Sequence, residues 1–305
     1  MRQHTIKQII KATGIGLHTG TLSKIEILPA APDTGIVFIK SNKNKITIIP
    51  ATSRHVTSTV LSTDIGRDGE TIRTIEHLMS AFCGCGIDNV YVNITGDEIP
   101  AMDGSAAPFC FLIKEAGVVA QSSFRKFLRI DKPVKVRDGM GWAELLPHPG
   151  FALDFSIEFD NSVIGKSRYS IDCLTQNYWT EISRARTFGF IKDTAKLHES
   201  GAALGASMSN AIVLDDYSVL NQGGLRYPDE FVRHKILDAI GDLYVSGYQI
   251  IGKYRAHASG HRINNLLLEA AFSKGAVSIV QSPRFESSFL FDYLKPDSIY
   301  IPATS

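Results

Sequence analysis

The sequence lacks an excess of charge of either sign, and it lacks a long apolar run. Its 32 lysines and arginines nearly balance 31 aspartates and glutamates, so the formal net charge is +1 and nothing indicates a nucleic-acid surface or a polybasic membrane patch. No run approaches the ~18 apolar residues of a membrane span, and residues 1–7 lack the apolar region of a signal peptide. We therefore expect a cytoplasmic protein that binds no nucleic acid and has no integral membrane segment. The oligomeric state stays open, with a monomer favoured.

Cysteine is also scarce. The four cysteines at positions 83, 85, 110 and 173 are too sparse for a disulfide framework and show no CxxC spacing. We expect reduced thiols that are buried or half-buried rather than metal ligands. Apolar residues, by contrast, make up 44% of the 305 residues, which excludes a disordered chain and is enough for two domains of about 150 residues each.

The first half of the chain reads as strands followed by helices. The spacing of Ile75, Leu78, Met79 and Phe82 predicts a helix that Thr74 caps. Alternation predicts strands over 24–28, 35–39, 45–49 and 90–94, a second helix is expected over 107–116, and residues 117–125 are expected to form a linker.

After the expected linker, the order of sheet followed by helices starts again. Strands are expected over 127–130, 133–136, 152–157 and 254–257, and helices over 229–245 and 264–272. The predicted fold class is α+β with two similar sheet-plus-helices domains. The expected parts are an N-terminal domain over 1–120, a C-terminal domain over 126–282 with an insertion at about 188–213, and a tail over 283–305.

The helix expected over 229–245 carries a polar stripe opposite an apolar one. His234, Lys235, Asp238 and Asp242 share the polar stripe. His234 and Asp238 stand at i and i+4, the spacing that lets two side chains on adjacent turns chelate one metal ion. Taken alone, this spacing favours an ordinary solvated face by about two to one, because i,i+4 charge pairs are common on helices.

The earlier helix changes that balance. Its apolar stripe leaves Glu76, His77 and Ser80 on the other side, so His77 is a candidate third ligand. Two histidines and a carboxylate with an open fourth position are typical of a catalytic zinc site rather than a structural one. Glu76, beside a ligand, then becomes a candidate to take a proton from the zinc-bound water.

Seven blocks of the sequence carry a resemblance to a known enzyme family. They are Gly14–Gly20, Thr74–Ala81, Gly86–Asn89, Glu98–Phe109, Ser183–Phe190, Phe231–Leu243, and Ser259–His261 with Asn264 and Asn265. In this order, over nearly the whole length, the chain resembles the zinc-dependent UDP-3-O-acyl-N-acetylglucosamine deacetylases. The resemblance implies hydrolysis of the N-acetyl group of a UDP-linked, 3-O-acylated glucosamine to acetate and a free amine, the committed step of lipid A biosynthesis. It also implies two similar α+β halves around a shared active site.

The resemblance assigns roles to individual residues. One Zn²⁺ ion would be held by His77, His234 and Asp238, with Glu76 as general base, His261 as the acid that protonates the departing amine, and Asp242 as the partner that favours the charged imidazole. Thr187 would stabilise the oxyanion, Phe188 would pack against the sugar, and Lys235 would approach the phosphates. The insertion, including Gly205 and Ala206, would line a passage for the acyl chain.

One position departs from the family pattern, and two other functions stay open. Ala258 stands where a basic residue often precedes Ser-Gly-His, with Arg255, His257 and Arg262 as nearby alternatives for nucleotide contacts. The first alternative function is a zinc amidase that uses the same ligands on a different acylated amine or sugar. The second is a metal-stabilised module that recognises a UDP-lipid without turnover.

Overall fold

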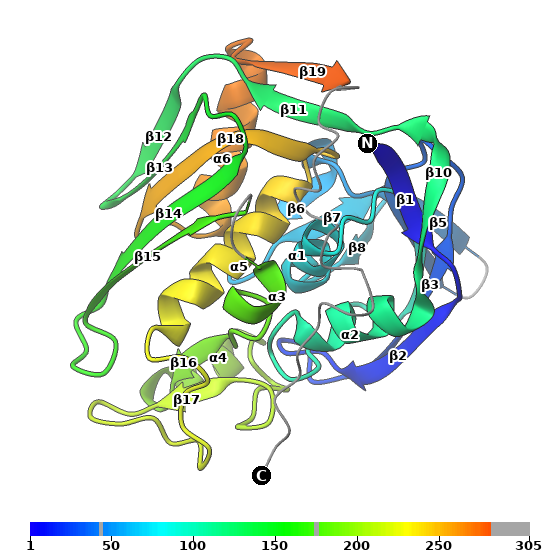
Figure 1. The fold of residues 1–305 in the computed structure, drawn as a ribbon. Helices are drawn as coiled ribbons and strands as arrows, with labels where there is room; N and C mark the ends of the chain where they lie inside the picture. Colours follow the sequence, from blue (N-terminus) through cyan, green and yellow to red (C-terminus); the bar gives the residue numbers. More distant parts are fainter. Residues whose placement is uncertain (43–44, 174–176, 282–305) are drawn as a thin grey trace.

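The computed structural model describes residues 1–42, 45–173 and 177–281, and it has the expected α+β fold. Figure 1 shows helices α1 (Glu76–Gly84) and α5 (Glu230–Tyr244) side by side near the centre, with a large sheet on either side of the pair. No helix in the described part is long and apolar enough to cross a membrane. The expected tail, 283–305, lies outside the described residues.

The first large sheet has five strands in the order β2-β3-β9-β4-β5. Its strands are β2 (Ile10–Ile15), β3 (Leu22–Pro29), β4 (Ile36–Asn42), β5 (Lys45–Pro50) and β9 (Val90–Thr95). Strands β4 and β9 are parallel and the other neighbours are antiparallel. The four strands predicted in this half are confirmed, since each is rich in β-branched residues and packs buried side chains on the core. A small antiparallel sheet of β6 (Val56–Ser58), β7 (Asp64–Arg67) and β8 (Glu70–Ile72) then leads to α1.

The second large sheet has seven strands, with β18 at its centre. The strands are β11 (Lys126–Ile130), β12 (Val134–Asp138), β13 (Gly141–Leu146), β14 (Phe151–Glu158), β15 (Lys166–Asp172), β18 (Gln249–His257) and β19 (Val277–Gln281). Strand β18 is parallel to β11 and β14 and antiparallel to β13. The predicted strands in this half are confirmed, and the end of β18 leads directly to the loop before α6 (His261–Ser273).

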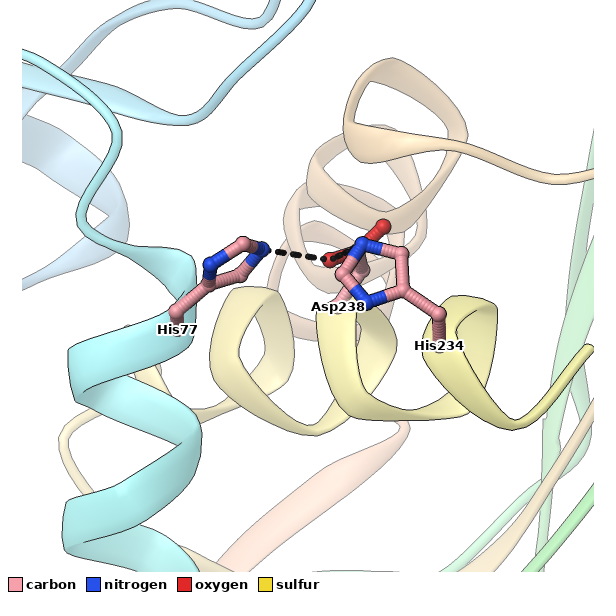
Figure 2. A group of neighbouring side chains, drawn as sticks. All are labelled: His77, His234 and Asp238. Carbon is pink, nitrogen blue, oxygen red and sulfur yellow. Dashed lines mark ion pairs between the residues drawn. The ribbon is translucent and has the colours of Figure 1, made fainter. Parts of the chain in front are cut away.

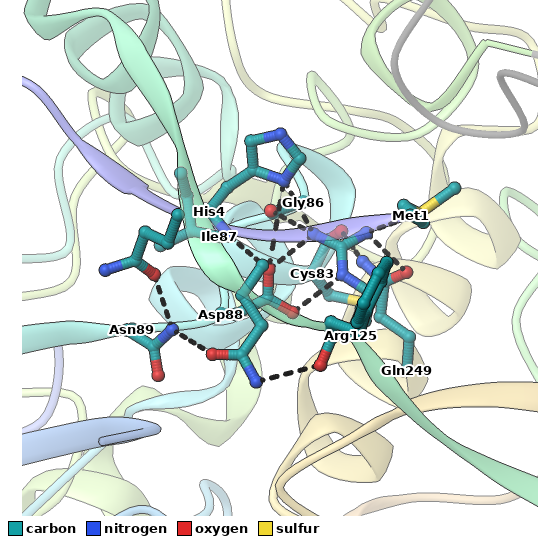
Figure 3. Close-up of polar contacts among 12 residues, drawn as sticks. Met1, His4, Cys83, Gly86, Ile87, Asp88, Asn89, Arg125 and Gln249 are labelled. Carbon is teal, nitrogen blue, oxygen red and sulfur yellow. Dashed lines mark hydrogen bonds and ion pairs between the residues drawn. The ribbon is translucent and has the colours of Figure 1, made fainter. Parts of the chain in front are cut away.

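The predicted linker is wrong, because residues 118–124 form strand β10 (Val118–Phe124). This strand pairs antiparallel with β1 (Arg2–Ile6), whose backbone groups would otherwise lack partners along that edge. Arg125, directly after β10, is 1% exposed and carries a network of contacts that Figure 3 shows. Its guanidinium donates to Asp88 (2.7 Å), to the Gly86 carbonyl (2.6 Å) and to Gln249 (3.3 Å). The segment therefore ties β1, the end of α1 and β18 together.

The helix boundaries mostly follow the sequence. Helix α2 (Ala107–Ala116) has its predicted limits, and α5 differs from its prediction by one residue at each end. Helix α6 begins at His261 rather than 264, since Gly260 before it is extended. Thr74 does not cap α1: Ile75 is the N-cap, and the Thr74 hydroxyl donates to Glu98 (2.9 Å) instead.

The predicted insertion is closed by its own two ends. Strand β16 (Phe188–Phe190) pairs parallel with β17 (Ile212–Leu214), so Phe188 lies opposite Ile212. Between them lie the 3₁₀ turn Ile191–Asp193 and helix α4 (Thr194–Glu199), and a further short helix, α3 (Tyr178–Glu181), precedes the segment. The two ends of the segment therefore lie side by side, next to α5. The division into domains at 120 and 126 stays a prediction.

Candidate active site

The polar stripe of α5 is buried against α1 and is not a solvated face. His234 is 2% exposed and Asp238 is 3% exposed. The two helices approach closely at Gly241, where an added Cβ would lie 2.0 Å from the Glu76 carbonyl oxygen. Close packing at this glycine places the polar side of α1 opposite the polar stripe of α5.

His77, His234 and Asp238 form one cluster, as Figure 2 shows. The Nε2 atoms of His77 and His234 lie 3.4 and 3.3 Å from Asp238 Oδ1. That oxygen is buried and has no hydrogen-bond partner among the described residues. Because a buried carboxylate oxygen without a partner is costly, the arrangement fits a cation between the three side chains.

At His234 and Asp238 the electrostatics and the hydrogen bonds agree with metal binding. His234 Nδ1 lies 3.1 Å from the Ala185 carbonyl oxygen, to which it donates, so Nε2 is left to face the cluster. Burial lowers the pKa of His234 to about 4, which keeps its imidazole neutral. Burial raises the pKa of Asp238, but the neighbouring His234 and Lys235 outweigh it and hold that pKa well below its usual value. A neutral imidazole and an ionised carboxylate are the forms that bind metal ions.

A second cluster, Glu76, Asp242 and His261, lies beside the first. His261 Nδ1 is 2.9 Å from Asp242 Oδ2, and His261 Nε2 is 4.0 Å from Glu76 Oε1. Burial raises the pKa of Glu76 to about 7. Burial lowers the pKa of His261, but Asp242 and Glu76 outweigh it and raise that pKa to about 9. Near neutral pH the cluster therefore combines a carboxylate able to accept a proton with an imidazolium able to donate one.

Two neighbours of this cluster had no role in the sequence analysis. The Thr63 backbone N–H donates to Glu76 Oε2 (3.0 Å), and the Thr63 hydroxyl donates to Asp242 Oδ1 (2.7 Å). Asn264 donates its amide N–H to Asp242 Oδ2 (2.8 Å). Asn264 belongs to a block that resembles the family, whereas Thr63 lies in none and carries no signal of its own.

Both clusters border one cavity of about 280 Å³. Its lining residues are Leu17, His18, Leu61, Thr74, Glu76, His77, Thr187, Phe188, Gly189, Leu197, Ala203, Ala206, Ala211, His234, Lys235, Asp238 and His261. Gly205 is not among these lining residues. It packs instead on the turn at Gly16, whose carbonyl oxygen would lie 2.2 Å from a Cβ added at Gly205. The cavity thus has a polar floor from α1 and α5 and a largely apolar wall from the segment 188–213.

Thr187, Phe188 and Lys235 all reach this cavity. The Thr187 segment is held to the first turn of α5 by the ion pair between Arg186 Nε and Glu230 Oε1 (2.9 Å), in which Glu230 is fully buried. The Phe188 ring lies edge-on to His234, with 6.2 Å between ring centroids. Lys235 donates from Nζ to Asp238 Oδ2 (2.9 Å).

The basic residues near Ala258 are already engaged with the protein. Arg255 donates to Glu144 (2.9 Å), and Arg262 pairs with Asp138 (2.8 Å). His257 Nδ1 lies 3.0 Å from the Ser156 hydroxyl. None of the three is among the described residues that line the cavity.

Comparison with known proteins gives a consistent result. A family model described as UDP-3-O-acyl N-acetylglycosamine deacetylase matches residues 3–273. A protein of Histophilus somni is 45% identical over 304 residues, covering 99% of this chain and 100% of the relative. Proteins of Haemophilus influenzae and Hahella chejuensis are 49% and 47% identical, covering 90% and 97% of this chain and 90% and 99% of their own lengths. All three are named UDP-3-O-acyl-N-acetylglucosamine deacetylase.

Proposed function

This chain belongs to the UDP-3-O-acyl N-acetylglycosamine deacetylase family, and from that premise we propose how its residues hydrolyse the N-acetyl group of UDP-3-O-acyl-N-acetylglucosamine in lipid A biosynthesis. One observation carries the assignment of roles. A buried set of metal ligands and a buried acid–base set face the same cavity from two packed helices. Neither set alone would define a hydrolase.

The metal set suits zinc. His77, His234 and Asp238 would hold the ion with two nitrogens and one oxygen from three buried side chains, and all three line the cavity. When bound, zinc polarises the amide carbonyl and increases the acidity of the attacking water. The ligands themselves are held in place by burial and by the hydrogen bond from His234 to Ala185.

The second set moves the protons. Glu76 takes the proton of the attacking water as the new carbon–oxygen bond forms at the acetyl carbon. The His261 imidazolium, held by Asp242 at 2.9 Å, gives its proton to the amide nitrogen as the carbon–nitrogen bond breaks. Acetate and the free amine of the sugar are the products, and the pKa values of about 7 for Glu76 and about 9 for His261 suit these directions of transfer.

The cavity wall orients the substrate. The Thr187 hydroxyl stabilises the negative charge that develops on the carbonyl oxygen, Phe188 packs against the sugar, and Lys235 approaches the phosphates. The apolar wall formed by Leu197, Ala203, Ala206 and Ala211 accommodates the 3-O-acyl chain. Ala206 contacts that chain, whereas Gly205 supports the site indirectly by packing against the turn at Gly16.

The cysteines support a reducing compartment such as the cytoplasm. All four lie within the described ranges, and each is buried and free of disulfide bonds. Burial raises the pKa of the Cys83 thiol to about 12, so the thiol stays protonated and unreactive. Unpaired thiols of this kind are typical of intracellular proteins.

Acetate release from UDP-3-O-acyl-N-acetylglucosamine, measured with and without a chelator, tests the proposal. We expect release by the purified protein, loss of release with the chelator, and recovery on addition of zinc. Equal kcat/KM on UDP-N-acetylglucosamine without the acyl chain would favour an amidase of other specificity. Tight substrate binding with no acetate would instead identify a module without turnover.

A further inference from the structure

We propose that Thr63 is a positioning residue that fixes the general base and the partner of the general acid relative to each other. The inference rests on the roles proposed above for Glu76, Asp242 and His261, and it extends them to a residue that does not touch the substrate. Thr63 is not among the residues that line the cavity.

Thr63 bonds to both proton-transfer carboxylates at once. Thr63 as a whole is 2% exposed. The backbone N–H donates to Glu76 Oε2 at 3.0 Å, and the hydroxyl donates to Asp242 Oδ1 at 2.7 Å. Glu76 comes from α1 and Asp242 from α5, so a single residue outside both helices bonds the two carboxylates. Buried donors to an ionised carboxylate form strong hydrogen bonds.

The segment that carries Thr63 is itself held tightly to the start of α1. The Thr63 carbonyl accepts from the Ile75 N–H (3.1 Å), and Asp64 Oδ1, one residue later, accepts from the Thr74 N–H (3.2 Å). Leu61 and Thr74 both have left-handed backbones, with φ of +65° and +57°. Residues other than glycine rarely adopt this conformation, and it persists where surrounding contacts enforce it. Thr63 is therefore placed before substrate arrives.

The hydroxyl completes the orientation of Asp242. Asp242 Oδ2 accepts from His261 Nδ1 (2.9 Å) and from Asn264 (2.8 Å), while Oδ1 accepts the Thr63 hydroxyl. Donors on both oxygens fix the plane of the carboxylate, and the carboxylate in turn fixes the imidazole ring of His261. Without the hydroxyl, a buried oxygen keeps only a longer contact of 3.2 Å to His261 Nδ1.

Two variants of Thr63 separate this role from simple packing. Thr63→Val keeps the shape and removes the hydroxyl, whereas Thr63→Ser keeps the hydroxyl and removes a methyl group. Both keep the backbone N–H. We expect Thr63→Val to lower kcat roughly ten- to a hundred-fold, the range for losing a hydrogen bond to a charged group, with KM and zinc content unchanged. Thr63→Ser should retain most of kcat. A packing role predicts the opposite order, with Ser impaired and Val active, and that order would overturn the inference.

Thr47 provides a matched control. It is another buried threonine, 3% exposed, whose hydroxyl has no hydrogen-bond partner in the described part of the chain. Thr47→Val should leave kcat unchanged. If the unaltered protein releases no acetate, the proposed function fails; if it releases acetate and Thr63→Val matches it, only the role of Thr63 fails. Circular dichroism of each variant identifies loss of fold. If Thr63→Val misfolds, Thr63→Ser decides. An impaired kcat in a folded, zinc-loaded Thr63→Ser protein would contradict the inference.

Discussion

At the scale of single residues, burial gives neighbouring side chains opposite protonation states. Burial raises the pKa of Glu76 to about 7 and lowers that of His234 to about 4. Burial alone would lower the pKa of His261, but Asp242 and Glu76 outweigh desolvation and raise that pKa to about 9. One buried pocket thus holds a neutral imidazole, a proton acceptor and a proton donor.

The His261–Asp242 contact predicts a change in the pH profile. The imidazolium is present below pH 9 and lost above it, so the rate should fall as pH rises through about 9. Asp242→Asn removes the negative charge that raises this pKa, which should then move toward the ordinary value of about 6.5. The alkaline limb of kcat/KM should shift to lower pH by at least about one unit. His261→Ala serves as the control that lacks this limb, and an unmoved limb in Asp242→Asn would separate Asp242 from the mechanism.

The sequence could indicate the candidate metal ligands but not the surroundings that suit them to a metal ion. Taken alone, the i,i+4 spacing of His234 and Asp238 favours a solvated face by about two to one, and only the contact with α1 decides against that reading. Thr63 could not be predicted, because its hydroxyl bonds to a residue 179 positions away. The resemblance places Gly205 at the acyl passage, whereas in the structure its lack of a side chain permits the close approach to Gly16.

At the scale of elements, the site depends on how closely α1 packs against α5. Both helices were predictable from apolar periodicity, and α2 was predicted with its observed limits. The expectation that Thr74 caps α1 failed, because its hydroxyl serves Glu98 and its backbone is left-handed. Local preference for a cap was overridden by a tertiary contact.

Gly241→Ala tests the close approach of the two helices. Alanine is favoured over glycine in a helix by about 1 kcal/mol, yet here its Cβ would lie 2.0 Å from the Glu76 carbonyl oxygen. We expect a net destabilisation of about 1–3 kcal/mol and a loss of activity, measured by denaturant unfolding and acetate release. Gly223→Ala is the control, since nothing described lies within 4 Å of an added Cβ there. Equal stability of both variants would contradict the close packing.

Ala206→Trp tests the wall of the insertion segment. Ala206 lines the cavity together with Leu197, Ala203 and Ala211, so a large ring there should displace part of the acyl chain. We expect kcat/KM for a long-chain substrate to fall roughly ten-fold or more, the equivalent of about two buried methylenes, while a chainless analogue is spared. Ser209→Trp, at an exposed residue that is not among the described lining residues, should affect neither substrate. An equal loss on both substrates would place Ala206 away from the chain.

At the scale of the whole molecule, a buried arginine joins parts that are distant in the sequence. The small polar residues of 117–125 were expected to form a linker, and that expectation failed because residues 118–124 pair with β1, which lies 112 or more positions earlier in the sequence. Arg125 then reaches Asp88, Gly86 and Gln249 in a region that no local pattern identifies. The sheets and helices could be predicted from periodicity, whereas these long-range polar contacts could not.

Arg125→Leu should therefore destabilise the whole fold. Removing one partner of a buried ion pair leaves Asp88 uncompensated and costs about 3–5 kcal/mol, which thermal unfolding would report as a lower Tm. Arg129→Leu removes an arginine that is 52% exposed and pairs with Asp131 at the surface, so its effect should stay below about 1 kcal/mol. Similar Tm values for the two variants would show that the Arg125 network adds no stability.

Zinc titration into metal-free protein, with acetate release followed at each addition, tests the central claim most directly. The claim is that His77, His234 and Asp238 hold one catalytic zinc ion and that Glu76 is a base rather than a ligand. It predicts a plateau of activity at one zinc per chain, and a Glu76→Gln variant that binds the same amount of zinc but turns over roughly 10²–10⁴-fold more slowly. Full activity without zinc, or loss of zinc binding in Glu76→Gln, would contradict it.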